Sequence, residues 1–146
     1  MVTVPDEGQS VSEPEAGTSW SFDERLPYDS TAPGVARRLV RDLLHRSGNS
    51  SNQVVDSGEL VVHELVINGL THGLPDGHHR IDVSGKLTED HLVISVRDAG
   101  RAGTVAALPP TEDRAGGRGL AMVAALSSSW TVDRTRGTRV SAWLEL

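Results

Sequence analysis

The stretch that decides the fold is "HELVINGLTHG", residues 63–73, which has the pattern of a long, mostly apolar helix. At 100° per residue Glu64, Asn68 and His72 fall on one narrow stripe, while the rest of the circumference is apolar. Such a stripe either faces water on an ordinary amphipathic helix or lines a pocket. Residues 60–73 contain no Lys or Arg, which solvent faces normally carry. Gly69 costs about 1 kcal/mol relative to alanine inside a helix and indicates a close approach. We therefore favour the pocket.

The composition is that of one soluble domain with a single core. The chain has 146 residues, 37% of them hydrophobic, and no apolar run long enough to cross a membrane. It has no cysteine, which excludes disulfides, thiolate catalysis and cysteine-bound zinc. The first residues lack the features of a secretory signal, so we expect a cytoplasmic protein with no membrane association.

Charge is unevenly distributed along the chain. Residues 1–17 hold four acidic and no basic residues, so only −2 of the net charge of −6 belongs to the remainder. We expect residues 1–17 to form a disordered acidic tail and residues 18–146 to form the domain. A nearly balanced domain gives no support for direct nucleic-acid binding.

The order of expected elements defines the fold class. Residues 19–27 alternate as a strand does, and a helix follows with Ser30 or Thr31 as its N-cap and Gly48 as its stop. The second helix runs from about Ser51 to Thr71. Further elements are strands 79–87 and 91–100, a loop over 99–117, a short helix from Gly119, and strands 130–137 and 138–146 with a turn at Arg136-Gly137. This order predicts an α+β sandwich of two layers, with helices on one face of a mixed, mainly antiparallel sheet.

Three further patterns carry possible chemistry. In "VISVRDAGRAG" Asp98 ends a strand with Gly100 two positions later, which is either a simple turn or a buried hydrogen-bond acceptor. In "RAGGRGLAMV" several glycines precede a helix start, a pattern that suits either a flexible linker or backbone contacts to phosphate. The last is "RGTRVSAWLEL", in which Thr138 follows Gly137 at the start of a strand.

Together these patterns resemble the ATPase superfamily of histidine kinases, Hsp90, gyrase and mismatch-repair proteins, whose domain is the Bergerat ATP-binding fold. The closest resemblance is to the bacterial anti-sigma-factor serine kinases. "ELVINGLTHG" is similar to the family's N box, "VISVRDAGRAG" to its G1 box and "RAGGRGLAMV" to its G2 box. The resemblance extends through most of residues 18–146, although Ala102 stands where a second G1 glycine is usual and Gly103 comes one position later.

The resemblance implies specific roles. Glu64 would be the general base, Asn68 would supply an amide oxygen to Mg²⁺, and Asp98 would accept a hydrogen bond from the adenine amino group of ATP. His72 would contact the nucleotide or a Mg²⁺-bound water, or it would only favour the dipole at the helix end. The remaining residues expected to bind the nucleotide are Gly100, Gly103, Gly117, Arg118, Gly119, Leu120 and Thr138. Arg118, with Arg114 or Arg101 as alternatives, would balance phosphate charge or remain solvated.

Three functions remain open at this point. The first is an ATP-dependent protein serine/threonine kinase that phosphorylates an anti-anti-sigma partner of the STAS type and sequesters a sigma factor, which the resemblance implies together with a homodimer. The second is an ATP-binding regulatory module with little or no kinase activity. The third is an α/β domain whose glycines are only loops.

Overall fold

The computed structural model describes residues 20–100 and 117–146, and it contains three helices and five strands in these ranges. The strands are β1 (Ser21–Pro27), β2 (Arg80–Leu87), β3 (His91–Asp98), β4 (Ser129–Asp133) and β5 (Thr138–Glu145). The helices are α1 (Ala32–Arg46), α2 (Asn52–His72) and α3 (Gly117–Leu126). None of these helices combines the length and apolar character needed to span a membrane.

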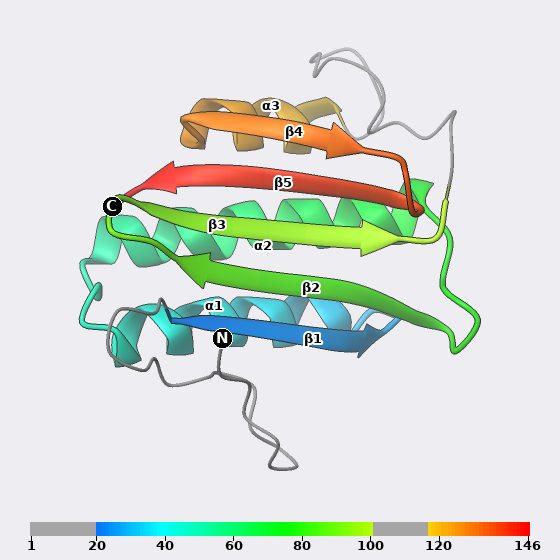
Figure 1. Cartoon of the computed structure of the whole chain (residues 1–146), viewed down its shortest axis with the longest axis horizontal. Coiled ribbons are helices and arrows are strands. Elements are labelled where there is room, and N and C mark those ends of the chain that lie inside the picture. Colours follow the sequence, from blue (N-terminus) through cyan, green and yellow to red (C-terminus); the bar gives the residue numbers. More distant parts are fainter. Residues whose placement is uncertain (1–19, 101–116) are drawn as a thin grey trace.

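The strands form one sheet in the order β1-β2-β3-β5-β4, and the helices lie against one face of it (Figure 1). Every pairing among these strands is antiparallel, so the predicted two-layer α+β sandwich is confirmed with an entirely antiparallel sheet in place of a mixed one. The chain returns from α3 through β4 and then inserts β5 between β4 and β3. This return brings the start of β5 beside the end of β3.

The core lies between the sheet and the helices. Along β3 the buried residues Leu92, Ile94 and Val96 alternate with half-buried ones, and the same alternation places Asp98 on the helix side. Helix α2 meets this layer with Val62, Leu65, Val66 and neighbouring apolar side chains. Asp98 is therefore the polar end of a row that is otherwise apolar core.

The boundaries of α2 agree with the sequence. Ser51 is its N-cap, and the Ser51 hydroxyl accepts a hydrogen bond from the Val54 N–H at 3.4 Å. Helix α1 also begins where predicted, but Thr31 does not cap it with its side chain. The Thr31 hydroxyl instead donates to Asp29 Oδ1 at 2.5 Å, because a nearby carboxylate is a stronger partner for a hydroxyl than a backbone N–H.

Several predicted boundaries differ from the structure by two or more residues, and one of them is the start of α3, which lies at Gly117 and not at Gly119. Strand β4 ends at Asp133 and not at residue 137, since the Asp133 carboxylate accepts hydrogen bonds from the N–H and hydroxyl of Thr135 and turns the chain early. Strand β3 ends at Asp98, two residues before the predicted end. The predicted tail over residues 1–17 and most of the predicted 99–117 loop lie outside the described residues.

Candidate functional site

The polar stripe of α2 does not lie in bulk water. Glu64, Asn68 and His72 are all half-buried. Oδ1 of Asn68 and Nε2 of His72 are completely shielded, and neither has a hydrogen-bond partner within residues 20–100 and 117–146. A buried polar atom without a partner costs about 1–3 kcal/mol. These two atoms therefore mark a place that a polar ligand would stabilise.

The carboxylate of Glu64 lies against the first turn of α3. A Cβ added at Gly119 would overlap with Glu64 Oε2, so a larger residue here would make the Glu64 side chain move. Helix α3 begins at Gly117, and the first backbone N–H groups of a helix have no partner within the helix and carry partial positive charge. The fold thus brings a carboxylate of α2 to a helix end suited to anions.

Asp98 lies at the opposite end of the stripe, against the C-terminal end of α2. Its Oδ1 accepts hydrogen bonds from the N–H groups of Gly100 (2.6 Å) and Leu74 (3.3 Å). A Cβ added at Gly73 would overlap with this carboxyl group, which is why the helix ends in glycine here. Burial raises the pKa of Asp98 above its ordinary value of 3.8, and the two backbone hydrogen bonds oppose that rise. Both backbone donors use Oδ1, so Oδ2 is left without a described donor.

The start of β5 fixes the chain that follows Asp98. The hydroxyl of Thr138, a residue only 1% exposed, donates to the carbonyl of Gly100 at 2.8 Å. Gly137 has φ +68°, and a Cβ there would overlap with the Asp98 carbonyl oxygen. Gly100 and Thr138, which the sequence places 38 residues apart, are thus joined directly.

Tyr28 is a residue of this region that the sequence patterns did not single out. Its hydroxyl donates to the carbonyl oxygens of Gly69 (2.7 Å) and Leu70 (3.2 Å) in the last turn of α2. The Leu74 N–H would ordinarily serve the Leu70 carbonyl, but it bonds to Asp98 instead. Burial and the nearby Asp98 charge both raise the pKa of Tyr28. Tyr28 therefore supplies the hydrogen bond that the Leu70 carbonyl lacks because the Leu74 N–H bonds to Asp98. Its only signal in the sequence is that it is the sole tyrosine.

The close approach predicted at Gly69 is confirmed, because a Cβ there would lie 2.7 Å from Ile81 Cδ1 of β2. His63 contacts Arg37 of α1 through Nδ1 and so packs between helices, away from Glu64.

The structure describes the remaining predicted site residues less completely. The side chain of Leu120 is buried in the core at 2% exposure, so only its backbone could meet a ligand. Gly117 begins α3, and Arg118 is in its first turn, but no side-chain position is described for Arg118. Gly103, together with Arg101 and Arg114, lies outside the described residues.

The length of α2 sets the dimensions of the site. Gly73 lies nine positions after Glu64, which corresponds to about 14 Å along a helix axis. Glu64 marks the end that faces the start of α3, and Asp98 marks the other end, with Asn68 and His72 between them. An elongated ligand with anionic groups at one end and a hydrogen-bond donor at the other fits this arrangement.

Cavity volume alone does not locate this site. A cavity of about 590 Å³ lies between the start of α2 and the end of α3 and is bounded by residues that include Val54, Ser57 and Leu126. None of the predicted site residues bounds it. Ser127, which bounds this cavity, also has a buried unpaired oxygen. The better guide is that the unpaired atoms of Asn68 and His72 lie on one helix between Glu64 and Asp98.

Comparison with known proteins places the chain in a family. No curated protein matches the chain significantly. The model of the histidine kinase-like ATPase domain matches residues 26–143, which include α2, Asp98, Gly119 and Thr138. The match covers most of the chain and both ends of the site. This protein therefore belongs to the family of histidine kinase-like ATPase domains, and membership implies that it binds and uses ATP.

Proposed function

We propose that this protein is an ATP-dependent protein serine/threonine kinase, in which Glu64 is the general base. The observation that carries the proposal is the contact between the Glu64 carboxylate and Gly119, which joins a proton acceptor to the anion-binding start of α3. ATP would lie along α2 with its adenine at Asp98 and its terminal phosphate near Gly119.

The hydrogen bonds of Asp98 indicate where the adenine would bind. Its Oδ1 is occupied by two backbone donors, whereas Oδ2 is available to accept from the exocyclic amino group of adenine. Guanine presents a carbonyl oxygen in place of that amino group, and the carboxylate would repel it. ATP is therefore preferred over GTP.

A magnesium ion fits the middle of the site. Among the described residues no group of three or more His, Asp or Glu side chains could hold a metal by itself. The buried unpaired Oδ1 of Asn68 is a suitable single oxygen ligand for Mg²⁺, which takes its remaining ligands from phosphates and water. When bound, the ion would neutralise phosphate charge. The unpaired His72 Nε2 lies one turn further along α2 and would bond to the nucleotide or to water there.

The transfer itself requires one proton acceptor. The hydroxyl oxygen of an acceptor serine forms a bond to the γ-phosphorus as Glu64 takes the hydroxyl proton. The bond between that phosphorus and the β–γ bridging oxygen breaks, and ADP leaves with the electron pair. The Glu64 carboxylate is half-buried beside α3, so it is already close to the proposed phosphate position before the acceptor arrives.

The partners are proposed from the resemblance of the sequence motifs. The acceptor serine would belong to an anti-anti-sigma protein of the STAS type, and the kinase would sequester a sigma factor as a homodimer. Capture from a bacterial lysate with the full chain in Mg-ATP and in Mg-ADP, followed by mass spectrometry, identifies the partners. Recovery of neither class of protein contradicts this assignment.

Glu64→Gln tests the kinase proposal. We expect ATP affinity to change less than twofold and phosphotransfer to the captured acceptor to fall by roughly 10²- to 10⁴-fold, the usual contribution of a general base. Asp56→Asn, which alters an exposed carboxylate on the same helix, is the control and should change neither. Tight ATP binding without transfer in the wild type would favour the regulatory module over the kinase. Absence of ATP binding would reject both.

A further inference from the structure

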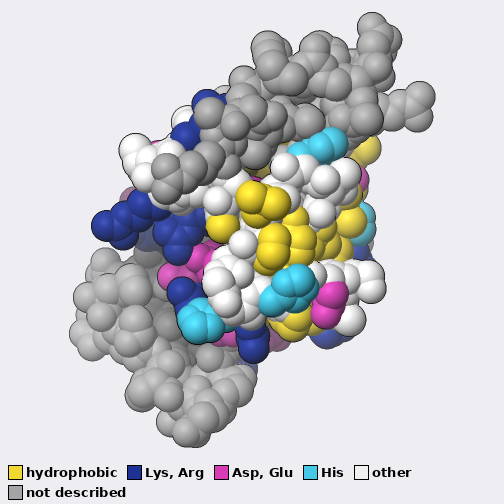
Figure 2. Space-filling view, turned by 90° about the vertical axis from the view of Figure 1, so that its right-hand side faces the viewer, with side chains coloured by type: hydrophobic (Ala, Val, Ile, Leu, Met, Phe, Trp, Pro, Cys, Tyr) yellow, Lys and Arg dark blue, Asp and Glu magenta, His cyan; other side chains and the backbone are white. Residues whose placement is uncertain are grey.

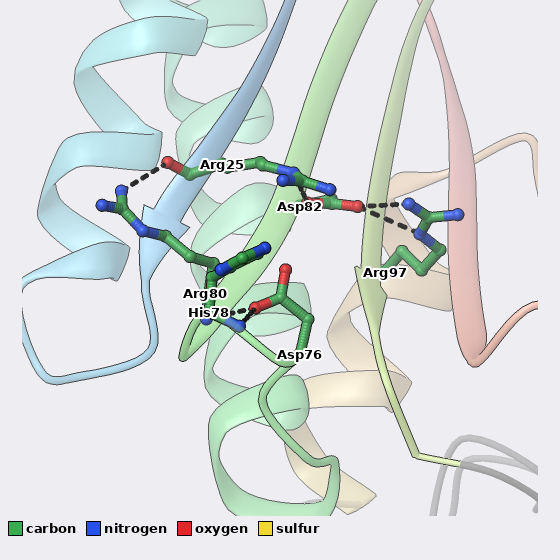
Figure 3. Close-up of polar contacts among 6 residues, drawn as sticks. All are labelled: Arg25, Asp76, His78, Arg80, Asp82 and Arg97. Atoms are coloured by element: carbon green, nitrogen blue, oxygen red, sulfur yellow. Dashed lines mark hydrogen bonds and ion pairs between the residues drawn. The ribbon is translucent and has the colours of Figure 1, made fainter.

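The face of the sheet that points away from the helices is covered by no helix or loop among residues 20–100 and 117–146 (Figure 1). One row of charged residues crosses all five strands on this face. The register places them side by side in the order Arg25, Asp82, Arg97, Arg139 and Asp133. Figure 3 shows the first three of them, with Asp82 between the two arginines. Figure 2 shows dark-blue and magenta side chains gathered together at this side of the molecule.

The charges of this row do not alternate, but they are opposite on the two sides of its middle. Arg97 is the middle residue, because β3 is the third of the five strands. One strand away from it lie Asp82 on β2 and Arg139 on β5. Two strands away lie Arg25 on β1 and Asp133 on β4. The row is therefore complementary in charge to the same row in reverse order.

Asp82 and Arg139 each lack a partner of the kind that the other provides. Oδ1 of Asp82 is completely shielded and accepts no hydrogen bond within the described residues, although Arg25 Nε lies 3.5 Å away. Arg139 forms no ion pair with any residue in 20–100 or 117–146. The two side chains do not meet within one chain, because β3 lies between their strands. A second copy of the chain offers both partners.

We propose that this face packs against the same face of a second copy of the chain, with the two-fold axis parallel to β3. Rotation about that axis reverses the order of the strands and leaves each row at the same level along them. Asp82 then meets Arg139 of the second copy, Arg25 meets Asp133 of the second copy, and the symmetry repeats both pairs. The homodimer under the proposed function rests on resemblance alone, and this inference gives it a surface that does not depend on ATP.

The meeting of Arg97 with its own copy at the axis does not prevent this packing. Oδ2 of Asp82 accepts hydrogen bonds from Arg97 Nε at 3.0 Å and from Arg97 Nη2 at 2.5 Å in the same chain. Such charge-assisted pairs are the strong ones. The axis therefore brings together two ion pairs and not two free guanidinium groups.

The two neighbouring rows on this face allow the sheets to approach each other. The interior of the next row consists of short side chains, Ser84, Ser95 and Ser141. The hydroxyls of Ser95 and Ser141 already bond to each other at 2.7 Å, so covering them costs little. In the row after that, Lys86 meets the half-buried ring of Trp143 of the second copy, which is a favourable place for a cation.

Arg139→Glu tests the charge pairing, with sedimentation velocity of the full chain without nucleotide as the measurement. The introduced carboxylate lies opposite Arg97 in its own chain, so the monomer should fold at least as well as the wild type. It meets Asp82 of the second copy, so the dissociation constant of the dimer should rise at least tenfold. Arg38→Glu, at an exposed position of α1, makes the same charge change away from the sheet and should alter this constant less than twofold.

Cysteine crosslinking tests the position of the axis, because the chain has no cysteine of its own. Val93 lies on β3 and faces its own copy across about 10 Å, the usual separation of packed sheets. Val93→Cys should therefore be crosslinked to a covalent dimer by a short bismaleimide. Thr131→Cys is the matched control on the same face, because β4 and its copy lie about 19 Å apart across the strands, and it should remain uncrosslinked.

Several results would overturn this proposal. A wild type that stays monomeric at high micromolar concentration removes the dimer, and a dimer that Arg139→Glu leaves unchanged places its interface elsewhere. Crosslinking of Thr131→Cys with none of Val93→Cys excludes an axis along β3. Capture of a different bacterial protein by a monomeric wild type, lost in Arg139→Glu, would assign the face to that partner. None of these measurements uses ATP, so failure here leaves the proposed phosphotransfer standing.

Discussion

Asp98→Asn separates nucleotide recognition from folding, because the two oxygens of this carboxylate have different partners. The side-chain oxygen of the introduced asparagine can occupy the position of Oδ1 and keep the hydrogen bonds from Gly100 and Leu74. The amide nitrogen then replaces Oδ2 and presents a donor to the amino group of adenine. A hydrogen bond to a charged group contributes about 1.5–3 kcal/mol, which converts to a roughly 10- to 150-fold weaker ATP affinity.

The same variant should fold as well as the wild type or better. Burial raises the pKa of Asp98 in the folded state, so this group contributes stability below its ordinary pKa of 3.8. That contribution is lost as pH rises through the raised pKa of the folded state. The unfolding free energy of the wild type relative to Asp98→Asn should therefore fall as pH rises from the ordinary pKa to the raised pKa of the folded state. The ATP affinity of the wild type should instead fall as the pH is lowered, because acid protonates Asp98. The ATP affinity of Asp98→Asn should not show this pH dependence.

The assay combines isothermal titration with ATP and denaturant unfolding of the unbound protein across this pH range. Asp90→Asn, which alters an exposed carboxylate between β2 and β3, controls for the loss of one negative charge. Unchanged ATP affinity in a folded Asp98→Asn protein would refute the contact between Asp98 and adenine. A severe loss of stability would refute the assignment of both backbone hydrogen bonds to one oxygen.

Three further substitutions test other contacts. Tyr28→Phe leaves the Leu70 carbonyl without its donor, so the unfolding free energy measured with denaturant should fall by about 1–3 kcal/mol. Titration should also show a weaker ATP affinity. If both values are unchanged, Tyr28 does not stabilise the end of the helix. Gly73→Ala should push the Asp98 carboxyl away and weaken ATP binding. Thr71→Ala, at an exposed position of the same helix, is the control and should weaken it less. Equal ATP affinities of the two variants would contradict the close contact. Ser51→Ala removes a helix cap and should cost about 0.5–2 kcal/mol in unfolding experiments, while ATP affinity stays as it is.

Much of the fold could be predicted because its signals are local. The N-cap at Ser51, the apolar circumference of α2 and the alternation along β3 each depend on neighbours within a few residues. The insertion of β5 beside β3 has no such signal, since it depends on how distant segments pack. The early end of β4 was missed because the Asp133–Thr135 hydrogen bonds compete with strand pairing, and residue types alone do not decide that competition.

The candidate site also contains residues that local spacing predicts and residues that it does not. Spacing on one helix placed Glu64, Asn68 and His72 on one stripe, and the shielded atoms of Asn68 and His72 show that this stripe is enclosed. The Tyr28 contact spans 41 residues and carries no periodic pattern. One row of charged residues also becomes visible only once the strand register is known, because each member comes from a different strand: Arg25, Asp82, Arg97, Arg139 and Asp133.

The tight packing of Gly73 on the Asp98 carboxyl also limits how base preference can be redesigned. A longer side chain such as glutamate at position 98 would have no room for its added methylene between α2 and the end of β3. A guanine-reading variant therefore needs new donors on the neighbouring backbone near Ala99 and Gly100 while position 98 stays short. Engineering of this pocket would begin with the loop and leave the strand unchanged.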